Sequence, residues 1–149
     1  MIIDYENVII KTVCRLLIPF IQLFAVYVIM HGHYSPGGGF QGGVILGASF
    51  IILVIAYGMK EAQRRISLKA LMIYASVGLI IYSGIGIVCL LMGGNYLDYA
   101  KLPLPISSTP AIRAMGILGI EIGVGIGVMA TMISIFLMIA SYEGGGKDG

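Results

Sequence analysis

Residues 31–43 read His-Gly-His-Tyr-Ser-Pro-Gly-Gly-Gly-Phe-Gln-Gly-Gly and form a polar break between two apolar runs, 16–30 and 44–57. Pro36 and the glycines after it do not continue a helix easily, because proline blocks the preceding turn and glycine loses the most backbone entropy on ordering. A simple turn needs only one or two such residues. The stretch therefore predicts a specialised connection between two apolar helices.

The composition is that of an integral membrane protein. The chain has 149 residues, of which 58% are hydrophobic and only 11% are charged, and its mean hydropathy is +0.99. An average soluble domain carries about 25% charged residues, so this chain has too few charges to cover a soluble surface. The net charge of +2 and the lack of a basic-aromatic patch argue against nucleic acid as a partner. The chain is therefore expected to lie in the lipid bilayer.

Four windows are long and apolar enough to cross a membrane, since a spanning helix needs about 20 mostly apolar residues. They cover about 12–30, 42–59, 70–91 and 113–139. The prediction is an all-α integral membrane fold with four transmembrane helices in a single domain, 1–142. A short polar cytoplasmic tail, 143–149, follows.

The distribution of Lys and Arg predicts the orientation of these helices. Seven basic residues fall on one predicted side and two, Lys101 and Arg113, on the other. Both termini and the connection 60–69 are therefore expected on the cytoplasmic side of the cell membrane, and loops 31–41 and 92–112 on the outer side. The seven basic residues are Lys11, Arg15, Lys60, Arg64, Arg65, Lys69 and Lys147.

The stretch 32–43 resembles the signature loop of the B subunit of Mrp-type (Mnh) cation/proton antiporters. The family pattern is Gly-His-Tyr-(Ser/Thr)-Pro-Gly-Gly-Gly-Phe-x-Gly-Gly, and every fixed position is present. These positions are Gly32, His33, Tyr34, Pro36, Gly37, Gly38, Gly39, Phe40, Gly42 and Gly43. Glu121-Ile122-Gly123-Val124 is similar to the acid-x-Gly-Val run in the last membrane helix of the family.

The resemblance implies an accessory, non-catalytic membrane subunit that helps to form or line a sodium/proton path in a larger complex. Its expected partners are other membrane subunits of an Mrp-like complex, including larger antiporter-like subunits. It also implies that this chain binds no metal and no cofactor, and that Na⁺ and H⁺ are the ions transported by the complex.

Two alternatives remain open at this stage. The same subunit type recurs in redox-driven membrane-bound hydrogenases and sulfur reductases, where hydrogenase-like soluble subunits would be additional partners. A stand-alone small proton-coupled exporter of four helices is the other. Such exporters place the essential Glu in the first helix and line the site with Trp, whereas this chain has Glu121 in the fourth window and no Trp.

Three titratable residues are candidates for an ion path or a proton-linked role. Glu121 is the only acidic residue within a predicted helix core, where a carboxylate costs about 2.5–3.5 kcal/mol and should face protein or water. A structural carboxyl group that bonds a neighbouring helix is the competing interpretation. His31 and His33 lie two residues apart and point in different directions, which disfavours a shared metal site. They could titrate near an ion entrance or order the loop through hydrogen bonds.

Small residues at spacings of three and four predict tight helix packing. Gly39, Gly43 and Gly47 follow this spacing in the second helix, and Gly119, Gly123 and Gly127 in the fourth. Glu121 falls on the opposite side of the fourth helix from that stripe. Two opposite faces then both need protein neighbours, which four helices in one small bundle cannot easily supply. This argument favours a multi-subunit complex.

Overall fold

The computed structural model describes residues 3–32, 34 and 37–145. This described part of the chain is helical and contains no strand. Its elements, in order, are α1 (Ile3–Met30), α2 (Gly39–Tyr57), α3 (Met59–Arg65), α4 (Leu68–Leu91), the short 3₁₀ helix η1 (Tyr99–Lys101) and α5 (Thr109–Gly145). Four of them, α1, α2, α4 and α5, contain segments long and apolar enough to cross a membrane. The predicted all-α class with four candidate spans is confirmed.

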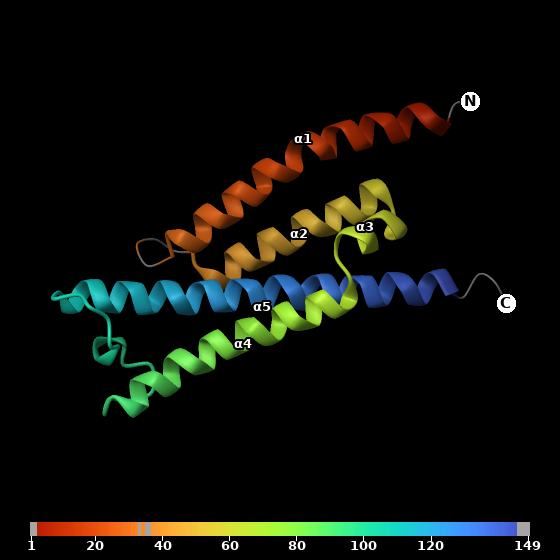
Figure 1. Ribbon diagram of the computed structural model, residues 1–149. Coiled ribbons are helices and arrows are strands. Elements are labelled where there is room, and N and C mark those ends of the chain that lie inside the picture. The colour runs from red at the N-terminus through yellow and green to blue at the C-terminus, as the bar shows by residue number, and fades with distance from the viewer. Residues whose placement is uncertain (1–2, 33, 35–36, 146–149) are drawn as a thin grey trace.

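The four long helices form an open row rather than a closed bundle. α5 packs against α2 on one side and against α4 on the other, and α1 packs on the outer side of α2. Figure 1 shows both termini and α3 at one end of the row, and the α1–α2 connection and η1 at the other. We call these two ends the terminal end and the loop end.

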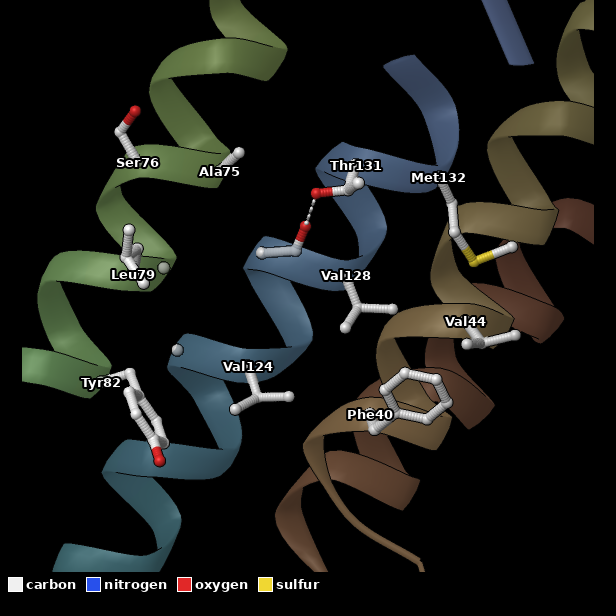
Figure 2. A pocket seen from close by; sticks show the side chains of 13 residues that line it. Phe40, Val44, Ala75, Ser76, Leu79, Tyr82, Val124, Val128, Thr131 and Met132 are labelled. Carbon is white, nitrogen blue, oxygen red and sulfur yellow. Dashed lines mark hydrogen bonds between the residues drawn. The ribbon is translucent and has the colours of Figure 1, made fainter. Parts of the chain in front are cut away.

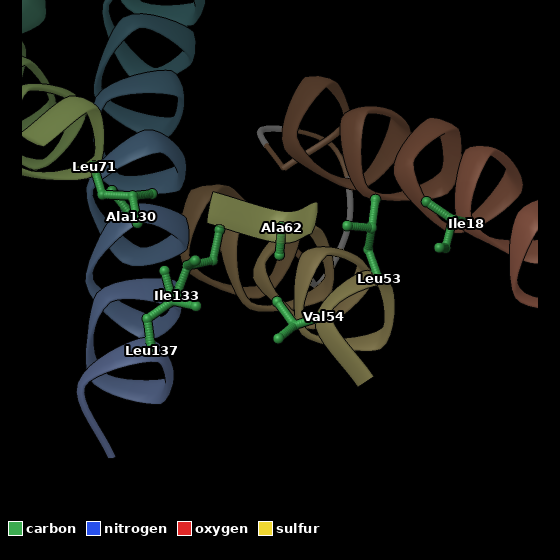
Figure 3. Close-up of a cluster of buried hydrophobic side chains, with 8 residues drawn as sticks. All are labelled: Ile18, Leu53, Val54, Ala62, Leu71, Ala130, Ile133 and Leu137. Atoms are coloured by element: carbon green, nitrogen blue, oxygen red, sulfur yellow. The ribbon is translucent and has the colours of Figure 1, made fainter. Parts of the chain in front are cut away.

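The main core lies toward the terminal end, where all five α-helices contribute buried apolar side chains (Figure 3). α5 supplies three of them, and the much shorter α3 supplies one, Ala62, which is only 6% exposed. The core residues are Ile18, Leu53, Val54, Ala62, Leu71, Ala130, Ile133 and Leu137. The short helix is therefore packed into the core rather than standing free.

α1 begins nine residues before the predicted window at residue 12, because no glycine or proline interrupts the sequence between Ile3 and Thr12. It contains Pro19, which lacks the N–H needed for a helical hydrogen bond and whose ring crowds the preceding turn. Figure 1 shows α1 bending about halfway along its length, as a proline near the middle of the helix would cause.

α2 begins at Gly39, three residues before the expected position, and ends at Tyr57 rather than at residue 59. The N–H of Gly42 donates to the carbonyl oxygen of Gly38 over 3.0 Å and closes the first turn. Gly58 ends the helix with a φ of 87°, a value that glycine adopts without strain.

The connection 60–69, expected to be a loop, instead contains α3 and the beginning of α4. Ser67 caps α4, since its side chain accepts a hydrogen bond from the N–H of Ala70 over 3.2 Å. The helix consequently starts at Leu68, two residues earlier than predicted.

α5 covers Thr109–Gly145, whereas the prediction was 113–139 followed by a tail from residue 143. Nothing in the sequence stops the helix between residue 139 and Glu143, so it continues through two of the glycines assigned to the tail. The rest of the predicted tail, 146–149, lies outside the described residues.

Candidate functional site

The glycine-rich connection and Glu121 meet at the loop end of α2. A Cβ atom placed on Gly32 would collide with the Glu121 carboxyl group, and one placed on Gly38 would lie 3.4 Å from its Oε1. The Oε2 atom has less than 1 Å² of accessible surface. Gly38 has a φ of 132°, in a region that favours glycine. The backbone of this connection therefore encloses the carboxyl group closely, as only residues without side chains allow.

The same face of α2 continues the contact along α5. A Cβ on Gly39 would collide with the carbonyl oxygen of Glu121, and one on Gly43 would come within 2.6 Å of the carbonyl oxygen of Gly125. Gly47, one turn further, has space for ordinary contact with Met132, at 3.5 Å. The two helices thus approach most closely at Glu121 and separate toward the core.

The start of α2 places a partial positive charge beside Glu121. The first backbone N–H groups of a helix have no partner within it, and the aligned peptide dipoles add about half an elementary charge there. A carboxylate in this position is stabilised by about 0.3–1 kcal/mol at an exposed site and up to about 2 kcal/mol when partly buried. The α2 terminus therefore offsets part of the cost of burying this carboxyl group.

Glu121 lies level with the first turn of α2, not halfway along it. α5 continues beyond this level toward the loop end, since Arg113 lies eight residues earlier, or about 12 Å along the axis at 1.5 Å per residue. α4 reaches the level of Arg113 too, because Ile85 packs at Gly119 and α4 runs on to Leu91. The helices α1 and α2 consequently end about 12 Å before α4 and α5 do, and only the connection between them reaches further.

A cavity of about 550 Å³ occupies the resulting step between the two hairpins. The side chains on one face of α5, with Tyr34 of the connection, line it: Tyr34, Thr109, Pro110, Arg113, Ala114 and Ile117. Glu121 follows Ile117 by four residues, so it lies on the same face, one turn deeper. The cavity therefore approaches the buried carboxyl group from the loop end.

The two candidate histidines differ in what the structure describes. The His31 ring stacks on Tyr27, with ring centroids 4.2 Å apart, and its Nδ1 lies 3.1 Å from the carbonyl oxygen of Tyr27. His33 and Pro36 lie outside the described residues. Among the residues that are described, no three His, Cys, Asp or Glu side chains come together as metal ligands would.

The remaining signature residues face different neighbours. Gly42 faces α1, where an added Cβ would come within 2.9 Å of the carbonyl oxygen of Ala25, and Gly37 lies beside Val28. The side chains of Tyr34 and Phe40 are exposed, at 82% and 64%. The glycines of this connection thus serve two close contacts, one with α1 and one with α5.

The glycine stripe of α5 packs against α4. A Cβ on Gly119 would come within 2.8 Å of Ile85, and one on Gly123 would lie 3.1 Å from the carbonyl oxygen of Gly78. A Cβ on Gly127 would meet nothing within 4 Å, although the backbone of Gly127 contacts Gly78. α4 and α2 therefore cover the two opposite faces of α5. The expectation that the chain could not supply both was wrong, because the open row leaves α5 between two neighbours.

A second cavity, an open groove of about 750 Å³, lies between α2 and α4 over α5 (Figure 2). Phe40 and Val44 line one wall, and Leu79 and Tyr82 line the other. The hydroxyl of Thr131 donates to the carbonyl oxygen of Gly127 over 2.8 Å, and that of Ser76 to Met72 over 2.9 Å. These two hydroxyls bond to their own helices, and apart from them and Tyr82 the side chains that line the groove are apolar.

Sequence reasoning missed the cavity beside Glu121. Arg113 and Ile117 precede Glu121 by eight and four residues, a spacing that places all three on one helix face. This spacing was the available signal, but Arg113 entered the prediction as a basic residue of the outer side and as the start of the fourth window, not as part of a site. The contribution of Tyr34 depends on how the connection folds back, which no local pattern indicates.

The fold and the site define a multi-pass membrane protein with one buried carboxyl group held by a glycine-rich connection. Over residues 9–134 the sequence matches the model of the family described as "Domain related to MnhB subunit of Na+/H+ antiporter", and the chain belongs to this family. The resemblance seen in the sequence is confirmed.

Two curated relatives are similar to nearly the whole chain. A Staphylococcus haemolyticus protein named "Putative antiporter subunit mnhB2" is 29% identical over 145 residues, covering 96% of this chain and 98% of the relative. A Staphylococcus aureus (strain MRSA252) protein of the same name is 27% identical over 137 residues, covering 91% and 95%. The similarity thus spans nearly the full length of this chain and of both relatives.

Proposed function

We propose that this chain is a membrane subunit of an Mrp-type Na⁺/H⁺ antiporter and works with other membrane subunits, larger antiporter-like ones among them. Membership of the MnhB family and the names of the relatives support this function. The observation that carries the proposal is the enclosure of Glu121 by the connection 31–38, which unites the two features that resemble the family.

In this proposal Glu121 handles protons rather than Na⁺. Arg113 at the adjoining cavity and the N-terminus of α2 both contribute positive potential near the carboxyl group. This positive potential opposes protonation as well as Na⁺ binding, because it stabilises the ionised carboxylate. A proton, however, needs only a covalent bond to one carboxylate oxygen, whereas a bound Na⁺ needs several oxygen ligands at once. The cavity of about 550 Å³ gives water access from the loop end.

The proposed location is the cell membrane, with the terminal end in the cytoplasm. Lys60, Arg64, Arg65 and Lys69 lie in and around α3 at this end, and an excess of Lys and Arg is typical of cytoplasmic connections. His31 and the candidate cavity then face outward.

The chain is proposed to be a transport component rather than an enzyme, with no cofactor of its own. Na⁺ and H⁺ are then ions moved by the whole complex. A redox-driven host complex is not better supported, since the relatives are named as antiporter subunits. The same names favour a subunit over a stand-alone exporter.

Glu121→Gln in the assembled complex tests the role of the carboxyl group. This change preserves size and removes the exchangeable proton, so Na⁺-dependent proton efflux in everted membrane vesicles should fall to the level of vesicles without the complex. The apparent KM for Na⁺, measured on any residual activity, should stay unchanged. Glu61→Gln is the matched control, because Glu61 forms an exposed ion pair with Arg65 at the other end.

Assembly of the complex is checked by co-purification with an affinity-tagged partner subunit. An assembled Glu121→Gln complex that exchanges ions at the wild-type rate would show that the carboxyl group is structural only. A raised KM for Na⁺ with an unchanged maximal rate would instead assign Na⁺ binding to Glu121 and contradict the proton role.

A further inference from the structure

A third cavity, of about 740 Å³, lies at the terminal end, where α3, α4 and α5 come together. Its lining combines polar and apolar side chains: Gln63, Ser67, Leu68, Leu137, Met138 and Ser141. Neither Glu121 nor any residue of the signature loop lines it. The ion path proposed above therefore does not use this cavity.

Among the described residues, no charged side chain lines this cavity, but exposed cations lie next to its lining residues along the chain. Arg64 directly follows Gln63, and Lys69 directly follows Leu68, so both adjoin lining residues, and Lys60 lies one turn before Arg64 on α3. Arg65 is engaged elsewhere, since its Nε lies 3.4 Å from Glu61 and its guanidinium lies 5.9 Å from the centre of the Tyr57 ring. Arg64, Lys69 and Lys60 are therefore the cations available to a ligand.

The framework of these cations is fixed by the core. Ala62 is buried among side chains of the other helices, and Ile66 packs against the same cluster. α3 is thereby held against the bundle with its basic residues outward. A fixed basic surface beside a cavity differs from a mobile basic loop, because its ligand must match one geometry.

We propose that this cavity binds the phosphodiester headgroup of an anionic phospholipid. The hydroxyl of Ser141 and the amide of Gln63 can bond to the headgroup, while Leu68, Leu137 and Met138 contact the first part of an acyl chain. Basic pockets between membrane helices are suited to anionic lipid headgroups. Free phosphate would use the cations but would leave the apolar half of the cavity without a partner.

The test compares ligands on the purified full-length chain in a mild, lipid-free detergent. Phosphatidylglycerol, phosphatidylcholine and inorganic phosphate are titrated separately, and the shift in thermal unfolding midpoint is measured. Phosphatidylglycerol should raise the midpoint in a saturable manner, and the other two should not. The double variant Arg64→Gln with Lys69→Gln should lower the affinity for phosphatidylglycerol by about tenfold or more, because each cation near an anionic lipid contributes to binding.

Two further variants separate a built site from general attraction. Lys101→Gln with Arg113→Gln removes the same charge at the loop end and should leave the affinity unchanged. Ser141→Trp fills the cavity without altering charge and should also abolish the lipid-induced shift. Each of three results would overturn the proposal. These are equal losses of lipid affinity in both double variants, equal stabilisation by phosphatidylcholine or phosphate, and an unaltered lipid-induced shift in Ser141→Trp.

Discussion

At the scale of single residues, Gly39 makes the closest approach to another helix's backbone among the glycines that the structure describes, at Glu121. The first residue of α2 meets the backbone of α5 directly, and no flexible side chain lies between them to yield. A close approach of this kind depends on the missing Cβ alone. The position of the carboxyl group consequently depends on the glycines opposite.

Gly39→Ala is therefore expected to destabilise the fold. The added methyl group would force α2 away from α5, and overpacking of this kind costs about 1–3 kcal/mol. Gly84→Ala is the matched control, because a Cβ there would meet nothing within 4 Å, so the helix should gain up to about 1 kcal/mol from alanine's higher helix propensity. Denaturant titration in detergent measures both changes. Equal behaviour of the two variants would refute the close contact.

The sequence identifies Glu121 and the glycine-rich connection separately, but it does not reveal their contact. Each is visible because it breaks a local rule, one as a charge in an apolar helix and the other as glycines beside a proline. Their contact depends on the direction in which α2 leaves the connection. That direction is set by Gly38 and by packing on α5, which no local pattern encodes.

At the scale of elements, the interiors of the spans were predictable and their ends were not. Hydropathy determines which residues can lie in lipid, so three of the four predicted windows fall inside long helices, and the second, 42–59, extends two residues past the end of α2. Helix ends depend on caps and on tertiary contacts, as Ser67 and Gly58 illustrate. α3 was missed because it is short and largely charged, and it is stabilised by the burial of Ala62 rather than by its own pattern.

The cap of α4 provides a prediction at this scale. Ser67→Ala removes the acceptor for the N–H of Ala70 and should cost about 1 kcal/mol of stability. Ser76→Ala, where the hydroxyl bonds back to Met72 within the helix, should change stability by less than about 0.5 kcal/mol. Denaturant unfolding in detergent distinguishes the two. A larger loss in Ser76→Ala would argue against capping as the cause.

At the scale of the whole molecule, the order of helices in space differs from their order in the sequence. α5, the last helix, lies between α2 and α4. Helical periodicity located the two faces of α5 correctly, but periodicity does not reveal which helices cover them. Only the three-dimensional structure shows that both faces are covered by helices of this chain rather than by another subunit.

The orientation in the membrane is tested by single cysteines in a chain lacking Cys14 and Cys89. Asn95→Cys lies in the connection at the loop end and Gln63→Cys lies on α3, and both positions are exposed. In intact cells a membrane-impermeant maleimide should label Asn95→Cys at once, and Gln63→Cys only after permeabilisation. The reverse pattern would place the termini outside.

The unequal reach of the two hairpins has a consequence for the lipid around them. A bilayer of even thickness cannot match both pairs of helices, since α1 and α2 end about 12 Å short of α4 and α5 at the loop end. Acyl chains beside α1 and α2 must shorten or splay there, at a cost of a fraction of a kcal/mol per ångström, unless a neighbouring subunit fills the gap. Without such a neighbour, the hydrocarbon layer is thinner beside α1 and α2, and it extends only to the level of Glu121. Under the proposed proton role of Glu121, the barrier that a proton crosses at this point would be thinner than the surrounding membrane presents.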